Sequence, residues 1–256
     1  MKAILLVGLA ATTGSVSSAA AQAGNRVVEI PLLVVSGRLM VTVDGPHGTR
    51  HDFVLGLGPT LLTRTGAARI GAAKSRLAVG GVPVSLESAV TVADAELAGG
   101  GVVAAGVLGG ETLNRFDALI DVPNGRLVLK PVGRAVRWDG VPLSNPVAVR
   151  VFHDVLIRVD IEVGGKLFGG LLDLTSPGLE VNAALRAAAN IRGDRVDSFR
   201  MGYAGWPDLP VRVVDSPVIR RWDGQGAGFA IIGAAVAHDC AIAVSWAHSE
   251  LRTCLR

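Results

Sequence analysis

The chain has 256 residues, of which 50% are apolar and 18% are charged, and its formal net charge is +3 at pH 7. The apolar content is ample for a hydrophobic core. The near balance of charges, without a basic run interleaved with aromatic residues, argues against nucleic-acid binding.

The N-terminal segment, residues 1–23, has the pattern of a secretory signal peptide. Met1-Lys2 gives a short basic start, an apolar run follows, and Ala21-Gln22-Ala23 forms a small-x-small cleavage site. We therefore expect a mature chain that starts near Gly24 and is released into the periplasm or outside the cell. No later segment has the length and apolarity expected of a transmembrane helix.

Strand patterns dominate the first half of the mature chain, residues 24–136. Apolar and β-branched residues predict strands over Val27–Val35, Leu39–Val43, Leu77–Val84, Ala118–Val122 and Arg126–Leu129. The third of these reads as a tight hairpin. Between the last two, Asn124-Gly125 is expected to provide the positive-φ positions of a two-residue turn. Short helices are expected over Thr63–Ile70 and Glu111–Arg115.

The same order of elements recurs in the second half, residues 147–256. Strands are expected over Val155–Val163, Phe168–Leu172, Ala241–Trp246 and Leu251–Leu255, with a short helix over Asn182–Ala189. The first of these strands ends at the turn residues Gly164-Gly165. The Asn that opens this helix and the Thr that opens its first-half counterpart are both good N-caps. The sequence therefore predicts an internal duplication of about 110 residues. The two copies are joined by residues 137–146, where turn residues cluster.

Each half also contains an apolar strand that ends in a turn of small residues. The first such segment is Phe53–Thr60 and the second is Leu171–Pro177. Each is followed later by two apolar residues and a glycine, Val107-Leu108-Gly109 in the first half and Ile231-Ile232-Gly233 in the second.

At these residues the sequence resembles the retropepsin-like aspartic peptidases, in a secreted bacterial form with two lobes on one chain. The most specific segment runs over Gly106–Leu127 and is similar to the family's apolar-apolar-Gly motif, helix and closing hairpin. The resemblance covers essentially the whole mature chain. It implies an all-β fold, in which two similar lobes of an acid-peptidase double β-barrel enclose a cleft.

The first turn departs from the pattern that the resemblance implies, which is Asp followed by Thr and Gly. Gly56 stands at the catalytic Asp position, Leu57 replaces the Thr, and Gly58 matches the Gly. Gly56 has no side chain for acid–base work, so we expect a small gap there. We also expect Gly56 and Gly58 to adopt positive φ in a tight turn.

The second turn has the carboxylate of the family pattern but differs from that pattern at the next two positions. Asp173 stands at the catalytic position, Leu174 replaces the Thr, Thr175 replaces the Gly, and Ser176 matches. In the family two carboxylates share a proton and hold a water between them, one acting as base and the other as acid. A lone Asp is ionised at neutral pH and has no matching acid.

The structural alternative for Asp173 is a buried or half-exposed acid hydrogen-bonded to nearby backbone N–H groups. Leu57 and Leu174 replace the threonines that normally tie the two turns together, so they indicate a site refilled with apolar side chains. The aromatic, Gly-rich segment Met201–Trp206 has two interpretations, a flap over the second lobe or ordinary packing.

Two cysteines, Cys240 and Cys254, lie near the C-terminus. In an oxidising compartment such a pair favours a disulfide that staples the last two strands. The alternative is two buried thiols, because a simple hairpin does not place these residues directly opposite each other. His-Asp pairs occur at turns and strand edges, without the further ligands of a metal site. We expect neither a metal nor another cofactor.

The leading functional prediction is a secreted, catalytically impaired aspartic-peptidase-like protein. It is expected to be a monomer that binds extended peptide in the cleft, with Leu57, Gly58, Leu174, Thr175 and Ser176 as contact residues. One alternative is an active endopeptidase that relies on Asp173, including a form in which two chains bring their Asp173 residues together. The other is a structural envelope protein with a closed cleft.

Overall fold

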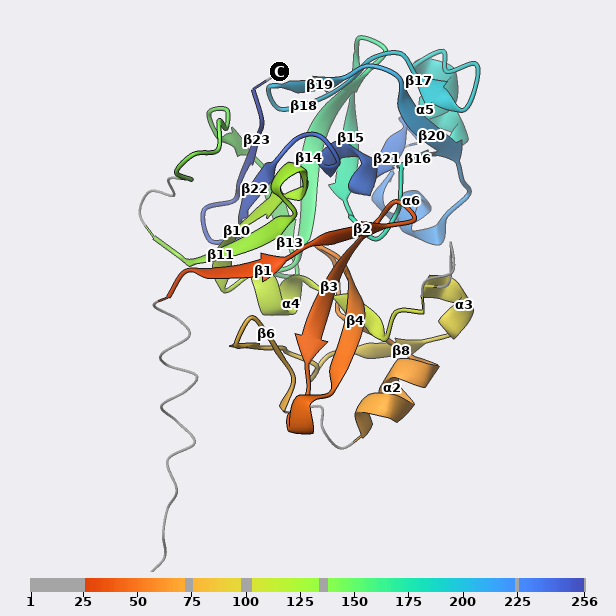
Figure 1. Ribbon diagram of the computed structural model, residues 1–256. Coiled ribbons are helices and arrows are strands. Elements are labelled where there is room, and N and C mark those ends of the chain that lie inside the picture. The colour runs from red at the N-terminus through yellow and green to blue at the C-terminus, as the bar shows by residue number, and fades with distance from the viewer. Residues whose placement is uncertain (1–25, 72–75, 98–102, 134–137, 224–225, 256) are drawn as a thin grey trace, which may run out of the picture.

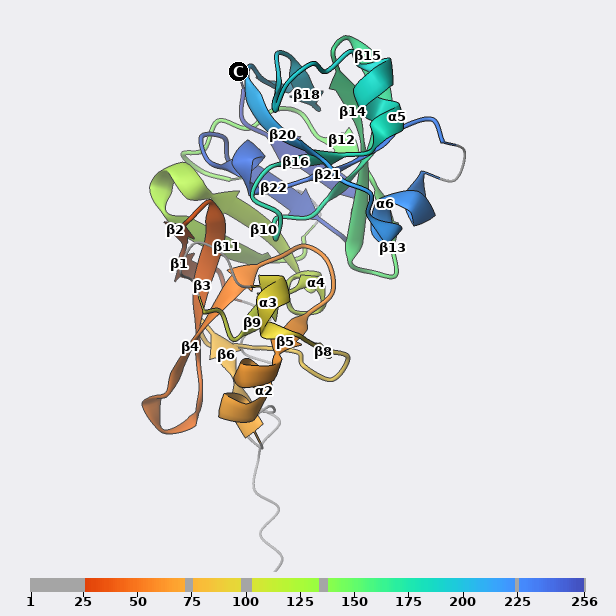
Figure 2. The same cartoon turned by 90° about the vertical axis from the view of Figure 1, so that its right-hand side faces the viewer.

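The computed structural model describes residues 26–71, 76–97, 103–133, 138–223 and 226–255. The expected signal peptide, residues 1–23, lies outside the described residues. Within the described part the protein is mostly β, and its strands form three sheets, two of which curl into half-barrels. First-half elements lie at the bottom and second-half elements at the top, with a sheet made from both between them (Figures 1 and 2).

The sheet made from both halves is called the shared sheet. Its strands, in spatial order, are β1 (Val28–Pro31), β11 (Arg126–Pro131), β10 (Phe116–Asp121), β22 (Ile242–Ser245), β23 (Glu250–Thr253) and β12 (Val147–Ala148). The halves meet where β10 pairs antiparallel with β22, with Leu119 opposite Ala243. Each half thus gives one side of this sheet.

The first-half sheet has a hairpin at its centre. Its strands, in spatial order, are β7 (Val82–Pro83), β6 (Ala78–Val79), β3 (Arg38–Asp44), β4 (Arg50–Leu55), β9 (Gly106–Leu108), β5 (Leu61–Thr63) and β8 (Val90–Val92), and β2 (Leu33–Val35) pairs with β3. The short helices of this half are α2 (Arg64–Ile70), α3 (Asp94–Leu97) and α4 (Gly110–Leu113), with 3-10 turns η1 (Pro46–Gly48) and η3 (Val122–Asn124).

The second-half sheet is built in the same way. Its strands, in spatial order, are β17 (Arg195–Val196), β20 (Leu209–Val213), β16 (Leu179–Val181), β21 (Phe229–Ile232), β15 (Lys166–Leu172), β14 (Leu156–Val163), β18 (Phe199–Met201) and β19 (Ala204–Trp206), and β13 (Arg150–Phe152) pairs with β14. The short helices here are α5 (Ala183–Ala188), α6 (Pro217–Trp222) and the 3-10 turn η4 (Ala234–Ala237).

Strand pairing shows the internal duplication directly. In the first half β4 runs parallel to β9, β9 antiparallel to β5, and β5 parallel to β8. In the second half β15 runs parallel to β21, β21 antiparallel to β16, and β16 parallel to β20. Residues can therefore be compared position by position between the halves.

Local sequence explains several element boundaries. Helix α2 begins after Thr63, whose side chain accepts a hydrogen bond from the Gly66 backbone N, and α5 begins after Asn182, whose side chain accepts one from the Leu185 N. Gly164 turns β14 into β15 at a φ of 57° that glycine adopts without a Cβ clash. These two N-caps and this turn agree with the sequence prediction.

Two element predictions are wrong in detail. The expected strand Val27–Val35 is split, because β1 pairs with β11 while β2 pairs with β3, and the Leu32 N between them donates to the Gly125 O at 2.8 Å. The β10–β11 connection is not a two-residue turn. Asp121 pairs with Arg126, so a four-residue loop intervenes, and within it Gly125 has positive φ while Asn124 does not.

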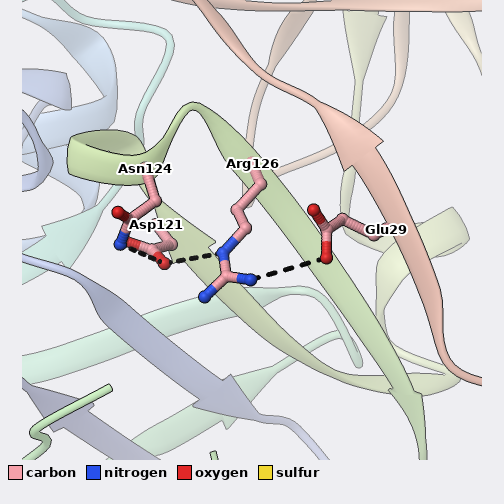
Figure 3. Close-up of polar contacts among 4 residues, drawn as sticks. All are labelled: Glu29, Asp121, Asn124 and Arg126. Carbon is pink, nitrogen blue, oxygen red and sulfur yellow. Dashed lines mark hydrogen bonds and ion pairs between the residues drawn. The ribbon is translucent and has the colours of Figure 1, made fainter. Parts of the chain in front are cut away.

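This loop is held by a buried carboxylate (Figure 3). The Asp121 side chain is 1% exposed and accepts hydrogen bonds from Asn124 Nδ2 and from Arg126 Nε, each at 2.9 Å. Arg126 also approaches Glu29 on β1 at 3.5 Å. The hydrogen bond to Asp121 raises the pKa of Arg126. These contacts tie the start of the chain to the shared sheet.

The main core runs without interruption from the first half to the second and includes Leu55, Leu57, Leu172 and Leu174. Smaller clusters lie on the outer face of each half's sheet. The segment expected as a linker, residues 137–146, is described from residue 138 onward. Its apolar residues, Trp138, Val141 and Leu143, pack on the shared sheet. None of the helices in the described residues is long and apolar enough to cross a bilayer.

Candidate functional site

The two turns singled out by the sequence occupy equivalent places in the two halves. The Gly56 N donates to the Leu108 O at 3.0 Å, and the Asp173 N donates to the Ile232 O at 2.9 Å. Gly109 and Gly233 follow those acceptor residues. A Cβ on Gly109 would lie 2.5 Å from the Gly58 O, and one on Gly233 would lie 2.3 Å from the Ser176 O. Both positions therefore require glycine because a turn crosses them closely.

The turns also contact each other across the two halves. A Cβ placed on Gly56 would lie 3.0 Å from Thr175 Cγ2 and 2.6 Å from Val107 Cγ1. The gap expected beside Gly56 is therefore wrong, because these two side chains fill it. The expected positive φ is also wrong, since neither Gly56 nor Gly58 has one. Gly56 is needed there for close packing and not for an unusual backbone conformation.

Leu57 and Leu174 follow the two key positions and are both fully buried. They belong to the core cluster that joins the halves. Where the resemblance expects two threonines that tie the turns together by hydrogen bonds, the turns here are joined by apolar packing.

Asp173 is half-buried, and Thr175 holds one of its oxygens. Asp173 Oδ1 accepts hydrogen bonds from the Thr175 N at 3.0 Å and from Thr175 Oγ1 at 2.7 Å. Burial raises the pKa of the Asp173 carboxyl, although the two Thr175 bonds oppose the shift, and the nearby Glu180 carboxylate adds to it. The Asp173 carboxyl therefore keeps its proton to a higher pH than an exposed aspartic acid does.

Glu180 and Ser176 complete the surroundings of the second turn. Ser176 Oγ donates to Glu180 Oε1 at 3.0 Å, and Arg212 forms an ion pair with the same carboxylate. Ser176 is therefore part of a local hydrogen-bond network. No histidine among the described residues bonds to it, so it lacks the base of a nucleophilic serine.

The first turn has a carboxylate partner that sequence reasoning missed. Glu111, in the first turn of α4, accepts hydrogen bonds from the Thr60 N at 2.8 Å and from Thr60 Oγ1 at 2.6 Å. Thr60 is fully buried, and its Oγ1 accepts a bond from the Gly109 N at 3.2 Å. The available signal was an acidic residue at the helix start directly after Val107-Leu108-Gly109.

Several contacts close the region around the turns. A Cβ on Gly37, at the tip of the β2–β3 hairpin, would lie 3.5 Å from Pro177 Cβ, and one on Gly58 would lie 3.6 Å from Leu156 Cδ2. None of five well-formed surface hollows on the described residues is lined by a residue of either turn.

The segment Met201–Trp206 packs on its own half and forms part of the β18–β19 hairpin. Met201, Ala204 and Trp206 are buried, and the turn at Gly202 lies against Val147 of the shared sheet. The packing interpretation therefore describes this segment better than a flap over the turns.

The two cysteines form a disulfide, with Cα atoms 5.3 Å apart. The register of β22 and β23 places Ile242 opposite Thr253, so Cys240 and Cys254 lie just beyond the paired residues. The bond fastens the end of the chain to the start of β22. In the described part of the chain, no group of three or more His, Cys, Asp or Glu residues is placed to hold a metal ion.

No model of a known protein family matches this chain, and no curated protein matches it in sequence. The likeness to aspartic peptidases therefore remains a prediction from the residues of the two turns and the duplicated order of elements.

Proposed function

We propose that this chain is a secreted aspartic-peptidase-like protein that does not cleave peptide bonds and binds extended polypeptide instead. The observation that carries the proposal is the packing at Gly56. The side chains of Val107 and Thr175 occupy the space where a second catalytic carboxylate would have to begin. Without that group, the paired acid and base of the aspartic mechanism cannot form.

The other carboxylates near the turns are already engaged. Glu111 accepts two hydrogen bonds from Thr60, and Glu180 accepts bonds from Ser176 and Arg212. Each therefore stabilises its own turn and does not act as a free partner for Asp173. These bonds support a role for both acids in structure.

Strand β2 supports the binding half of the proposal. Leu33, Val34 and Val35 are 59%, 48% and 38% exposed, and β2 pairs only with β3 among the described strands. A hollow of about 580 Å³ beside it has an apolar part, which includes Leu33, Val35 and Met40, and a charged part formed by Asp44, Arg50 and Asp52. An exposed strand edge beside a hollow suits an extended peptide, because backbone hydrogen bonds give affinity and the hollow takes alternate side chains. We therefore assign the peptide to β2, beside the closed turns.

The disulfide is in keeping with a location outside the cytoplasm. The Cys240–Cys254 bond would persist in the periplasm or the extracellular medium, where thiols oxidise. This supports the export that residues 1–23 predict.

Cleavage of an unfolded substrate tests the catalytic half. A reduced, carboxymethylated protein is incubated with the mature chain from about pH 3 to pH 7, the range over which carboxyl groups titrate. We expect either that the substrate is not cleaved or that any cleavage persists in the Asp173→Asn variant. Cleavage that this change removes would overturn the proposal. Sedimentation of the active sample would then show whether two chains bring their Asp173 residues together.

Titration of unfolded peptides tests the binding half. We expect saturable binding, and Leu33→Asp should weaken it by at least about tenfold because it puts a charge in the apolar part of the hollow, against the bound peptide. Val90→Asp is the matched control, since Val90 is 58% exposed in β8 of the same sheet. Equal weakening by both changes would argue against β2 as the site.

A structural role with a closed cleft is the second candidate. The buried Leu57 and Leu174 and the absence of the turns from the hollows described above favour it. An absence of peptide binding up to millimolar concentration, together with an absence of cleavage, would select this role.

A further inference from the structure

The second-half sheet carries a charged hollow on its outer face, away from both turns and from β2. Its volume is about 580 Å³, and it lies between β14, β15, β21 and the end of α6. The residues that matter for its chemistry are Arg158, Asp160, Leu167, Gly169, Trp222 and Phe229. Figure 2 shows α6 beside β13 on this side of the molecule.

Arg158 lies across the floor of the hollow. Its guanidinium carbon is 5.7 Å from the centre of the Phe229 ring, and a Cβ on Gly169 would lie 2.9 Å from Arg158 Nη2. The side chain therefore rests on an aromatic ring and on a glycine that leaves room for it. Among the described residues, no carboxylate or carbonyl oxygen accepts a hydrogen bond from Arg158.

The fold itself does not require a charge at this position. Arg158 pairs with Leu171 in β15, as Met40 pairs with Val54 in β4 of the first half. Met40 is buried in the outer cluster of its sheet, whereas Arg158 is half-exposed in the hollow. The equivalent of Gly169 is Asp52, which pairs with Thr42 as Gly169 pairs with Asp160. The second half thus has a cation, Arg158, where the first half has an apolar residue. It also has a glycine where the first half has Asp52, which leaves space for the Arg158 side chain.

A second cation lies beside the first. Arg150 in β13 is directly opposite Arg158, where the first half has Leu33 opposite Met40. Like charges directly opposite each other destabilise a sheet. Arg150 makes no ion pair with any described residue. A bound anion would relieve this repulsion.

The walls of the hollow restrict the kind of anion. Asp160 lines it, and Asp223 lines it while accepting bonds from Asn182 Nδ2 at 2.6 Å and from the Gly228 N at 2.9 Å. Two acidic groups disfavour a doubly charged phosphate more than a singly charged carboxylate. Leu167, which is 78% exposed, and Trp222 offer apolar surface at the rim.

We propose that this hollow binds a carboxylate group carried on an apolar or aromatic body, with Arg158 as the group that receives the carboxylate. The source of the ligand is a small free carboxylic acid or the C-terminal carboxylate of a peptide. The site goes beyond the function proposed above and shares no residue with β2 or the turns, so either proposal can fail without the other.

A titration followed by nuclear magnetic resonance of the Gly169 and Gly228 amides tests the site. The probes are 3-phenylpropionate, N-acetylphenylalanine and N-acetylphenylalanine amide. We expect both carboxylates to saturate with a Kd of about 1 mM or tighter. The amide should bind at least about tenfold more weakly, because it lacks the charge that strengthens the hydrogen bonds to arginine. A short peptide ending in phenylalanine that binds at least about tenfold more tightly than phenylpropionate would identify peptide C-termini as the source. Similar affinities would identify small acids.

The first half supplies matched variants for this test. Arg158→Met installs the residue found at the equivalent first-half position and should weaken carboxylate binding at least about tenfold. Arg150→Leu likewise installs the first-half residue, one strand away and outside the lining. It removes the repulsion that the anion relieves, so it should also weaken carboxylate binding, but only by about threefold. Gly169→Asp should abolish binding, because the new carboxylate would form an ion pair with Arg158. This variant tests the proposal independently if Arg158→Met does not fold. The absence of saturable binding by the unmodified protein, or unchanged binding in Arg158→Met, would overturn the proposal.

Discussion

The first and second turns occupy equivalent positions but are held by different interactions. The first turn is fixed by close packing, with Gly56 against Val107 and Thr175, and by Glu111, which reaches it from a neighbouring helix. The second turn carries its own carboxylate, Asp173, which binds Thr175 two residues ahead.

The difference shows that equivalent turns can be held with or without a carboxylate of their own. In the first turn, close packing and the Glu111 carboxylate from α4 hold the backbone. In the second turn, Asp173 serves as a hydrogen-bond acceptor within the turn itself. Variants at Gly56, Glu111 and Asp173 test this comparison.

The largest effect is expected when a side chain is added at Gly56. Gly56→Asp should lower the free energy of unfolding by about 3 kcal/mol, because its Cβ collides with Val107 and it brings a carboxylate into a packed site. Urea denaturation at pH 7 measures this. Gly58→Ala is the control and should cost less than about 1 kcal/mol, since its Cβ would be in ordinary contact with Leu156 at 3.6 Å. Equal stability of Gly56→Asp and the unmodified protein would show that the turns are not packed as described.

A smaller effect is expected at Glu111. Glu111→Ala leaves the buried N–H and Oγ1–H of Thr60 without their acceptor and should cost about 2 kcal/mol. Glu111→Gln keeps an acceptor oxygen and should recover part of the loss. Asp173→Ala, the second-turn counterpart, should cost about 1 kcal/mol because its partner Thr175 is half-exposed. A larger loss at Asp173 than at Glu111, measured by urea denaturation, would reverse the comparison.

The smallest expected effect is a pH-dependent gain in stability when Asp173 is replaced by Asn. The pKa of this carboxyl is raised in the folded protein, so its contribution to stability is greatest at acid pH and falls as pH rises through the folded pKa. Asp173→Asn retains an oxygen for Thr175 and removes the buried charge. It should raise the melting temperature at pH 7 relative to the unmodified protein and leave it nearly unchanged at pH 3.5. A loss of equal size at both pH values would show that the raised pKa is wrong.

The sequence predicted the parts of the fold that depend on neighbouring residues. Thr63 and Asn182 cap helices as their chemistry predicts, and Gly164-Gly165 makes a tight turn between β14 and β15. The repeated order of strands also predicted equivalent halves, because a duplicated pattern of apolar runs and turns specifies a duplicated sheet.

The candidate site was less predictable because its interactions join distant segments. The contact of Gly56 with Val107 and Thr175 brings together three separate parts of the chain. The bond from Thr60 to Glu111 spans 51 positions. Propensity and spacing report on local backbone choices, and they do not report which side chain fills a given space. The contact of Arg158 with the Phe229 ring also joins distant segments, so the sequence could not predict it either.

The shared sheet has a consequence for how the chain reaches its final form during synthesis. Strand β10 finds its partner β22 only when Ala243 pairs with Leu119, more than a hundred positions earlier. Until β22 has been synthesised, the edge of β10 is unpaired and can pair with a strand of another chain. A product truncated before β22 would keep that edge permanently. Such a fragment should aggregate, and a growing chain would need its last residues, or a chaperone, to remain soluble.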